Sequence, residues 1–301
     1  MEEEILKMTE QGGSSPGITP TNSNSSVDDE AEYVTLPSQG VFYKGKYKDL
    51  DKLKVRKLNW TDEDLLVTKS YYDNGTLFDE MLKQTIVDEN GFQTEDLVPI
   101  DRDTIIWWLR IGAFGTEYQI PHVCSDKECK HKYNLTWDLA EFEMPDLPEE
   151  YAGEIRANGN VEILLPISQL KCKITVATIG KENKVNKFLK KRKENLAKNP
   201  KKASSADYIM TGRLLASIEV AYDNEGKEYK GIDELLVWLN KGNNGKPLPI
   251  VDSRYIIKKI KDISLIADTR KTFECPVCAH IEEDMRMPMS IYFFWPEFKE
   301  L

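Results

Sequence analysis

Each of two short segments, HVCSDKECKH (122–131) and FECPVCAH (273–280), carries a pair of closely spaced cysteines. Paired cysteine thiolates are typical ligands of structural Zn²⁺ sites, and soft sulfur ligands favour Zn²⁺ over Mg²⁺ or Ca²⁺. Four thiolates leave no open position for a reacting water, so we expect one structural ion rather than a catalytic one. The predicted ligands are Cys124, Cys129, Cys275 and Cys278.

The sequence also allows alternatives to a four-thiolate site. The first cysteine pair is spaced more widely than a CxxC, so a histidine could replace one thiolate; the candidates are His122, His131 and His280. The CPVC segment could instead be a redox motif, or the four thiols could be unconnected. CPVC does not open a helix after a strand in a thioredoxin-like βαβ pattern, which disfavours the redox interpretation.

Sequence typical of β-strands flanks both cysteine pairs, as in a zinc ribbon. We expect the two halves of this ribbon at 118–137 and 270–295, so that the metal closes the C-terminal part of the chain onto its middle. Zinc-finger peptides gain roughly 10–16 kcal/mol of apparent binding energy from the metal. Because the cost of closing a loop grows only with the logarithm of its length, a ribbon interrupted by a long insertion is energetically reasonable.

The sequence offers little sign of catalysis. It has no GxxxxGK[ST] and no HExxH, and no GxGxxG follows a strand. The three histidines all lie beside the cysteine pairs. The acidic pairs Asp62/Asp64 and Asp101/Asp103 stand at expected helix starts, where carboxylates stabilise the first turn, so we interpret them as caps. We therefore expect that the protein is not an enzyme.

The composition indicates a folded, acidic protein. Of 301 residues 40% are apolar, and the six tryptophans and thirteen tyrosines argue against general disorder. The net charge of −10 is unlike that of a protein that coats nucleic acid. No apolar run reaches the roughly 20 residues of a membrane helix, and the N-terminus is acidic where a secretory signal would be basic. We expect a soluble protein in a reducing cytoplasm, where paired cysteines bind metal more often than they form disulfides.

The chain organisation predicts a disordered acidic tail over 1–33 and a single α+β domain over 34–301. Within this domain we expect mixed helices and short antiparallel strands, with the small four-cysteine element closing the C-terminus onto mid-chain. The isolated Cys172 is expected to be a small core residue. Predicted strands cover 50–58, 161–167 and 171–179, and helical spacing is found at 101–115, 205–221, 231–239 and 252–267.

A strongly basic helix is predicted over 181–202, with one narrow apolar stripe formed by Val185, Phe188 and Leu189. Lysines on such a helix can neutralise phosphates, but no aromatic residues are interleaved for base stacking. A solvated face is the simplest interpretation, and contact with an acidic partner protein is a further one. The residues proposed for that contact are Lys184, Lys187, Lys190 and Lys191.

The order of motifs over about 34–180 resembles the baseplate hub subunit and hub-assembly proteins of T-even-type contractile-tailed bacteriophages, the myoviruses. The series begins with a Leu-Pro-Ser turn and ends with a Leu-Pro before the later strand pair. The matching residues are Leu36, Pro37, Ser38, Gly40, Tyr43, Val55, Arg56, Lys57, Leu58, Asp62, Glu63, Asp64, Leu65, Leu66, Asp101, Arg102, Arg110, Gly115, Tyr118, Leu165 and Pro166.

The resemblance implies a non-enzymatic protein of tail morphogenesis, either a central hub component or a hub-assembly chaperone. Its partners would be other baseplate hub, spike or tape-measure proteins, and its place the virion tail baseplate or the host cytoplasm during assembly. We expect neither a membrane nor a nucleic acid as partner. The alternative is a phage zinc-ribbon protein that binds nucleic acid or regulates transcription, against which stand the net charge and the lack of basic residues around CPVC.

Overall fold

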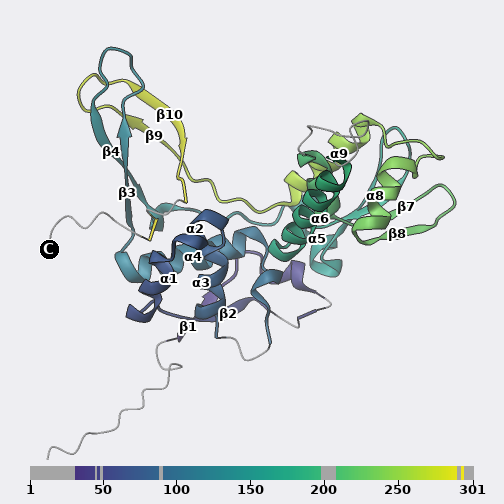
Figure 1. Ribbon diagram of the computed structural model, residues 1–301, viewed down its shortest axis with the longest axis horizontal. Helices are drawn as coiled ribbons and strands as arrows, with labels where there is room; N and C mark the ends of the chain where they lie inside the picture. The colour runs from purple at the N-terminus through teal and green to yellow at the C-terminus, as the bar shows by residue number, and fades with distance from the viewer. Residues whose placement is uncertain are drawn as a thin grey trace, which may run out of the picture.

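The computed structural model describes residues 31–44, 46–47, 50–87, 91–197, 208–289 and 293–294. The predicted mixture of helices and short antiparallel strands is confirmed, with three two-stranded sheets and one four-stranded sheet among the described residues. Figure 1 shows a central group of helices α1 to α4, a second group around the four-stranded sheet, and two hairpins that project away from both. The predicted tail lies outside the described residues as far as residue 30.

The first group of elements packs a short β-ribbon under a layer of helices. Strand β1 pairs antiparallel with β2 and begins at Ala31, before the predicted domain start at 34. The longest helix of this group, α4, starts with a proline, whose fixed φ suits the first helical position. Its inward side chains Ile105, Ile106 and Leu109 are buried. The elements are β1 (Ala31–Thr35), η2 (Val41–Tyr43), β2 (Lys52–Arg56), η3 (Trp60–Asp62), α1 (Glu63–Val67), α2 (Lys69–Asn74), α3 (Leu77–Thr85), η4 (Thr94–Asp96) and α4 (Pro99–Phe114).

The second group is built on an antiparallel sheet of order β5-β6-β7-β8. The strands predicted over 161–167 and 171–179 are confirmed as the antiparallel pair β5 and β6, but they end earlier, at Leu164 and Ile174. Cys172 lies fully buried in β6 as expected. Burial raises the pKa of its thiol to about 12. The elements are η5 (Leu139–Glu141), α5 (Glu149–Asn158), β5 (Val161–Leu164), β6 (Lys171–Ile174), α6 (Ile179–Ala197), α7 (Ile209–Ser217), β7 (Ile218–Tyr222), β8 (Glu228–Lys230), α8 (Gly231–Lys241) and α9 (Ile250–Ile263).

The helix predicted over 205–221 is wrong in its last part. Helix α7 ends at Ser217 and the chain continues directly into β7. In β7 the buried Ile218 and Val220 alternate with the exposed Glu219, which is the period of a half-buried strand. The helical spacing of apolar residues in α7 and their alternation in β7 overlap at the junction. Pairing with β6 decides the conformation there.

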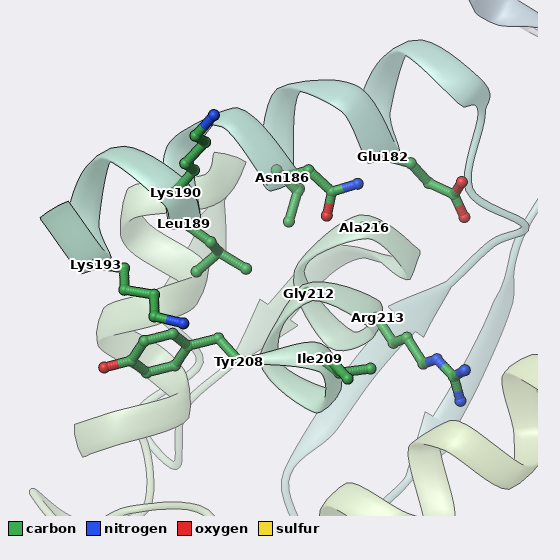
Figure 2. Close-up of a pocket in the computed structure, with 11 residues that line it drawn as sticks. Glu182, Asn186, Leu189, Lys190, Lys193, Tyr208, Ile209, Gly212, Arg213 and Ala216 are labelled. Carbon is green, nitrogen blue, oxygen red and sulfur yellow. The ribbon is translucent and has the colours of Figure 1, made fainter. Parts of the chain in front are cut away.

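The predicted basic helix is confirmed as α6 as far as Ala197, and residues 198–202 lie outside the described residues. Val185 and Leu189 are buried and Phe188 packs against the core, so the narrow apolar stripe holds the helix on the domain. The stripe faces α7 (Figure 2). The exposed side of α6 carries Lys184, Lys187, Lys190 and Lys191.

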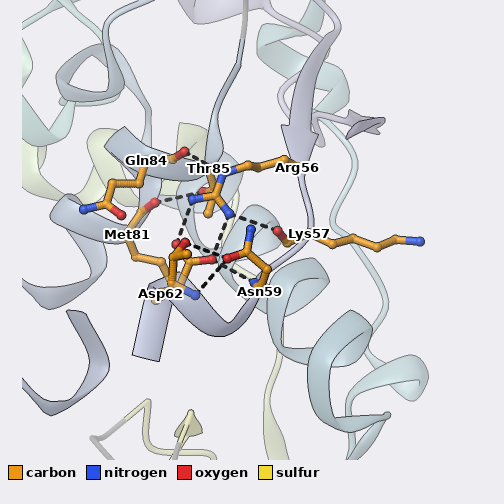
Figure 3. A network of polar contacts seen from close by, with 8 residues as sticks. Arg56, Lys57, Asn59, Asp62, Met81, Gln84 and Thr85 are labelled. Carbon is orange, nitrogen blue, oxygen red and sulfur yellow. Dashed lines mark hydrogen bonds and ion pairs between the residues drawn. The ribbon is translucent and has the colours of Figure 1, made fainter. Parts of the chain in front are cut away.

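A network around the Arg56–Asp62 ion pair joins β2 to the start of α1 (Figure 3). Two guanidinium nitrogens of Arg56 lie 2.8 and 2.7 Å from the two carboxylate oxygens of Asp62, and its Nε donates to the carbonyl of Gln84 in α3. The Asp62 carboxylate also accepts from the backbone N–H of Asn59, completing a capping box. Asp62 therefore has the capping role that its position predicts and an ion pair besides.

Asp62→Asn is expected to lower the free energy of unfolding at pH 7 by about 2 kcal/mol, since hydrogen bonds to charged groups are lost. Burial raises the pKa of Asp62, but Arg56 and the Asn59 N–H outweigh burial and lower it. The stabilisation is therefore present above the unfolded pKa of about 4 and lost as pH falls through the lower folded pKa. Chemical denaturation of both proteins across this range measures the difference, and a gap that stays constant into acid would contradict the assignment.

Candidate metal centre

The cysteine pairs lie at the tips of two antiparallel hairpins. The first hairpin is β3 (Glu117–Val123) with β4 (Lys132–Asp138), and the second is β9 (Arg270–Glu274) with β10 (Ile281–Arg286). The two hairpins belong to separate sheets. Figure 1 shows that they run side by side away from the helices, with their turns at the same end.

Direct contacts hold the two hairpins together at their base. The hydroxyl of Tyr118 in β3 donates to the carbonyl of Pro288, and the indole N–H of Trp137 in β4 donates to the carbonyl of Thr269. The rings of Trp137 and Phe273 meet edge to face at 4.8 Å between centroids. These contacts bring the C-terminal hairpin to the middle of the chain, as expected for a split element.

Hydrogen bonds from backbone N–H groups close each turn and bring its two thiols together. The N–H of Cys124 donates to the carbonyl of His131, and the carboxylate of Asp126 accepts from the N–H of Cys129. In the second turn the N–H of Cys275 donates to the carbonyl of His280. A residue with positive φ lies in each turn, Lys130 at 47° and Ala279 at 57°, an uncommon conformation for residues other than glycine.

All four Sγ atoms lie within 4.8 Å of one another, so the structure brings together the four predicted ligands. The Sγ atoms of Cys124 and Cys278 are 3.7 Å apart, and those of Cys129 and Cys275 are 3.8 Å apart. A tetrahedron of sulfurs at about 2.3 Å from a central Zn²⁺ has an edge of about 3.8 Å. A disulfide requires about 2.05 Å, and all four cysteines are free thiols. The cluster therefore has the size of a tetrahedral metal site.

Backbone N–H groups directed at the sulfurs suit the thiolate form. Burial raises the pKa of Cys275, but hydrogen bonds from the N–H groups of Cys278 and Val277 outweigh burial and lower the pKa to about 7. For Cys124 the effect of burial outweighs the hydrogen bond from the N–H of Asp126 and raises the pKa of the thiol to about 12. Hydrogen bonds to a charged form favour that form, so the second turn favours the thiolate of Cys275, whereas the pKa values of Cys124 and Cys129 in the first turn are raised.

The three histidines have other roles than ligation. Nε2 of His122 lies 3.2 Å from the Glu282 carboxylate, and Nε2 of His280 lies 2.9 Å from the Ser125 hydroxyl. The ring of His131 stacks on Tyr133. Among the described residues the group of potential metal ligands contains no histidine, so substitution of a thiolate by imidazole is not supported.

Glu282 is a functional residue that the sequence analysis missed. It lies in β10, and its carboxylate accepts from the backbone N–H of Ser125 in the other hairpin at 2.8 Å. This hydrogen bond and the one to His122 lower its pKa to about 2. The contact links the two tips directly beside the cysteines. Only the run of acids after CPVCAH could have indicated it, and such a run is usually a solvated face.

Comparison with known proteins places no relative beside this chain. No protein-family model, curated protein or solved structure matches it. None of the helices that the structure describes has both the length and the apolar composition needed to cross a membrane. The site must therefore be interpreted from its own chemistry, which is that of a closed four-thiol cluster between two hairpins.

Proposed function

We propose that the four-cysteine cluster binds one structural Zn²⁺ and that the two hairpins form a zinc-ribbon-like element split across the chain. The observation that carries this proposal is the size of the cluster, with Sγ–Sγ distances close to a tetrahedral edge. The four-cysteine donor set supports Zn²⁺, because soft thiolates select it over oxygen-seeking cations. A closed set of four protein ligands favours a structural role.

Metal analysis of the purified chain tests this proposal. We expect one zinc per chain, and replacement by Co²⁺ should give the visible absorption of tetrahedral cobalt together with the intense bands of sulfur-to-cobalt charge transfer. Absence of bound metal after purification with zinc, or a cobalt spectrum without thiolate bands, would exclude a four-cysteine site.

We also propose that the protein acts, without catalysis, in assembly of the baseplate hub of a contractile-tailed phage. The resemblance rests on the order of motifs in the sequence, and some of the matching residues contact one another in the fold. Ser38 and Tyr43 both donate to the buried carboxylate of Asp101, and Arg110 donates to the carbonyl oxygens of Gly115 and Glu117, where α4 leads into β3. Ser38, Tyr43 and Asp101 thus form one set of contacts, and Arg110 and Gly115 form another.

The alternative of nucleic-acid binding receives less support from the residues around the cluster. Strand β10 carries Glu282, Glu283 and Asp284 directly after the second cysteine pair, and Glu274 precedes it. Acidic side chains at the tip repel phosphates, and binding to nucleic acid depends on basic groups there. A steep, salt-sensitive affinity for DNA would favour this alternative over the hub proposal.

Mass spectrometry of purified phage particles tests the hub proposal. A fixed, low copy number per tail would identify a hub component, whereas presence in infected cells but not in particles would identify an assembly chaperone. A chain found in neither tail-assembly intermediates nor particles would contradict both roles.

Reversing the exposed charges of α6 is expected to weaken the complex with an acidic assembly partner at least tenfold, because long-range attraction becomes repulsion. Co-purification with tail-assembly proteins at two salt concentrations measures the effect. The variant changes Lys184, Lys187, Lys190 and Lys191 to Glu. A control variant of equal net charge changes the exposed Lys241, Lys246, Arg254 and Lys258 to Glu. Equal co-purification of both variants would remove α6 from the interface.

A further inference from the structure

A groove of about 420 Å³ lies between α6 and α7, in the part of the fold away from the cysteine hairpins (Figure 1). Figure 2 shows Leu189 and Lys193 of α6 directed toward α7 and Tyr208, whereas the ammonium group of Lys190 points away from α7. The groove arises where Gly212 of α7 faces α6, because a side chain added there would contact Leu189 and Val185. The apolar lining residues are Val185, Leu189, Tyr208, Ile209 and Ala216.

The groove leaves a large apolar side chain in contact with solvent. Ile209 is 62% exposed, and its neighbour Met210 is 46% exposed. Scattered apolar side chains on a surface are ordinary, but a concave apolar surface with an exposed isoleucine at its edge is typical of a binding groove. The groove is therefore suited to a segment with a few apolar anchors.

The two ends of the groove carry different charged side chains. Lys190 and Lys193 lie at one end, and Glu182 lies at the other, across from Arg213 of α7 (Figure 2). Among the described lining residues Glu182 is the one acid, so the groove is basic overall. Further exposed lysines continue along α6. Charge complementarity thus selects a segment that is acidic at one end and carries a basic residue toward the other.

We propose that the N-terminal segment of this same chain, MEEEILKMTEQ over 1–11, binds in the α6–α7 groove. Its acids at positions 2–4 complement the Lys190 end of the groove, and its one basic residue, Lys7, complements Glu182. The apolar side chains of the segment supply the anchors, as in recognition of an amphipathic segment by a groove. These are Ile5, Leu6 and Met8.

The connection to the domain is long enough for binding within one chain. The segment 12–30 is rich in Gly, Ser, Asn and Thr and reaches up to about 60 Å when extended. Covalent connection raises the effective concentration of the segment at the groove into the millimolar range, so modest contacts are enough to occupy it. This inference depends on neither the metal site nor the hub proposal.

Photo-crosslinking within the full-length chain tests the proposal. With p-benzoylphenylalanine placed at Met8, we expect crosslinks to α6 or α7 of the same chain, located by mass spectrometry and independent of protein concentration. The same probe at Ile18, in the connecting segment, is the matched control and should give little product at the groove. Raising the salt concentration from about 0.05 to 0.5 M should lower the yield at Met8, because exposed charges are screened.

Charge reversal separates a specific contact from chance proximity. Lys190→Glu with Arg213→Glu should lower the Met8 crosslink yield roughly fivefold, whereas the exposed pair Arg254→Glu with Lys258→Glu on α9 should leave it unchanged. Adding Glu3→Lys and Glu10→Lys to the groove variant should restore the yield. Crosslinks outside the groove, crosslinks only between two chains, or no response to either reversal would overturn the proposal.

Discussion

Replacing Cys275 and Cys278 together with serine is expected to abolish binding of the proposed ion and separate the tips of the two hairpins. The tips would then be joined only by hydrogen bonds such as that from the Ser125 N–H to Glu282. The apparent metal contribution is about 10–16 kcal/mol in zinc-finger peptides. Here the loss should be smaller, several kcal/mol, because Trp137, Phe273 and the other contacts at the hairpin base persist without metal.

Metal content and thermal unfolding, each with and without chelator, measure this effect. The double variant should contain no zinc, and chelator should lower the melting temperature of the wild type but not that of the variant. Cys172→Ala is the matched control: it removes a buried core thiol away from the cluster, so it should lower stability while keeping one zinc per chain. A double variant with wild-type metal content and stability would refute the site.

The pairing of the cysteines could be predicted because ligand chemistry restricts both residue type and local spacing. Two thiols held by one turn are visible in the sequence, and Cys124 can reach Cys278 only if the two turns meet. The same logic predicted the buried stripe of α6, since helical periodicity repeats within a few residues. Both features depend on neighbours in the sequence or on one strong chemical preference.

Features that depend on distant partners could not be predicted in this way. The sequence interpretation of Asp101 as a helix cap is wrong, because its carboxylate lies buried and accepts from Ser38 and Tyr43, far away in the chain. The helical spacing over 205–221 extends into β7, but pairing with β6 decides the conformation of that segment. Glu282 likewise gains its role only from the Ser125 N–H of another hairpin. Local patterns carry no signal for such contacts.

Asp101→Ala is expected to destabilise the domain by at least about 3 kcal/mol. The carboxylate is fully buried and accepts from the Ser38 N–H at 2.9 Å, the Ser38 hydroxyl and the Tyr43 hydroxyl at 2.6 Å. Removing it leaves three buried donors without an acceptor, and each unsatisfied group costs about 1–3 kcal/mol. Asp101→Asn keeps one carbonyl oxygen at the same place, so its loss should be about half as large. Chemical denaturation at pH 7 compares the two variants.

The pH dependence distinguishes this buried carboxylate from Asp62. Burial raises the pKa of Asp101, and the hydrogen bonds from Ser38 and Tyr43 offset burial only in part. A raised folded pKa gives stabilisation that is fully present below the unfolded value of about 4 and lost as pH rises through the folded pKa. The difference in free energy of unfolding between wild type and Asp101→Asn should therefore increase in acid, whereas the difference between wild type and Asp62→Asn should decrease. If both differences decreased in acid, Asp101 would be held in its ionised form by its donors, as Asp62 is by Arg56.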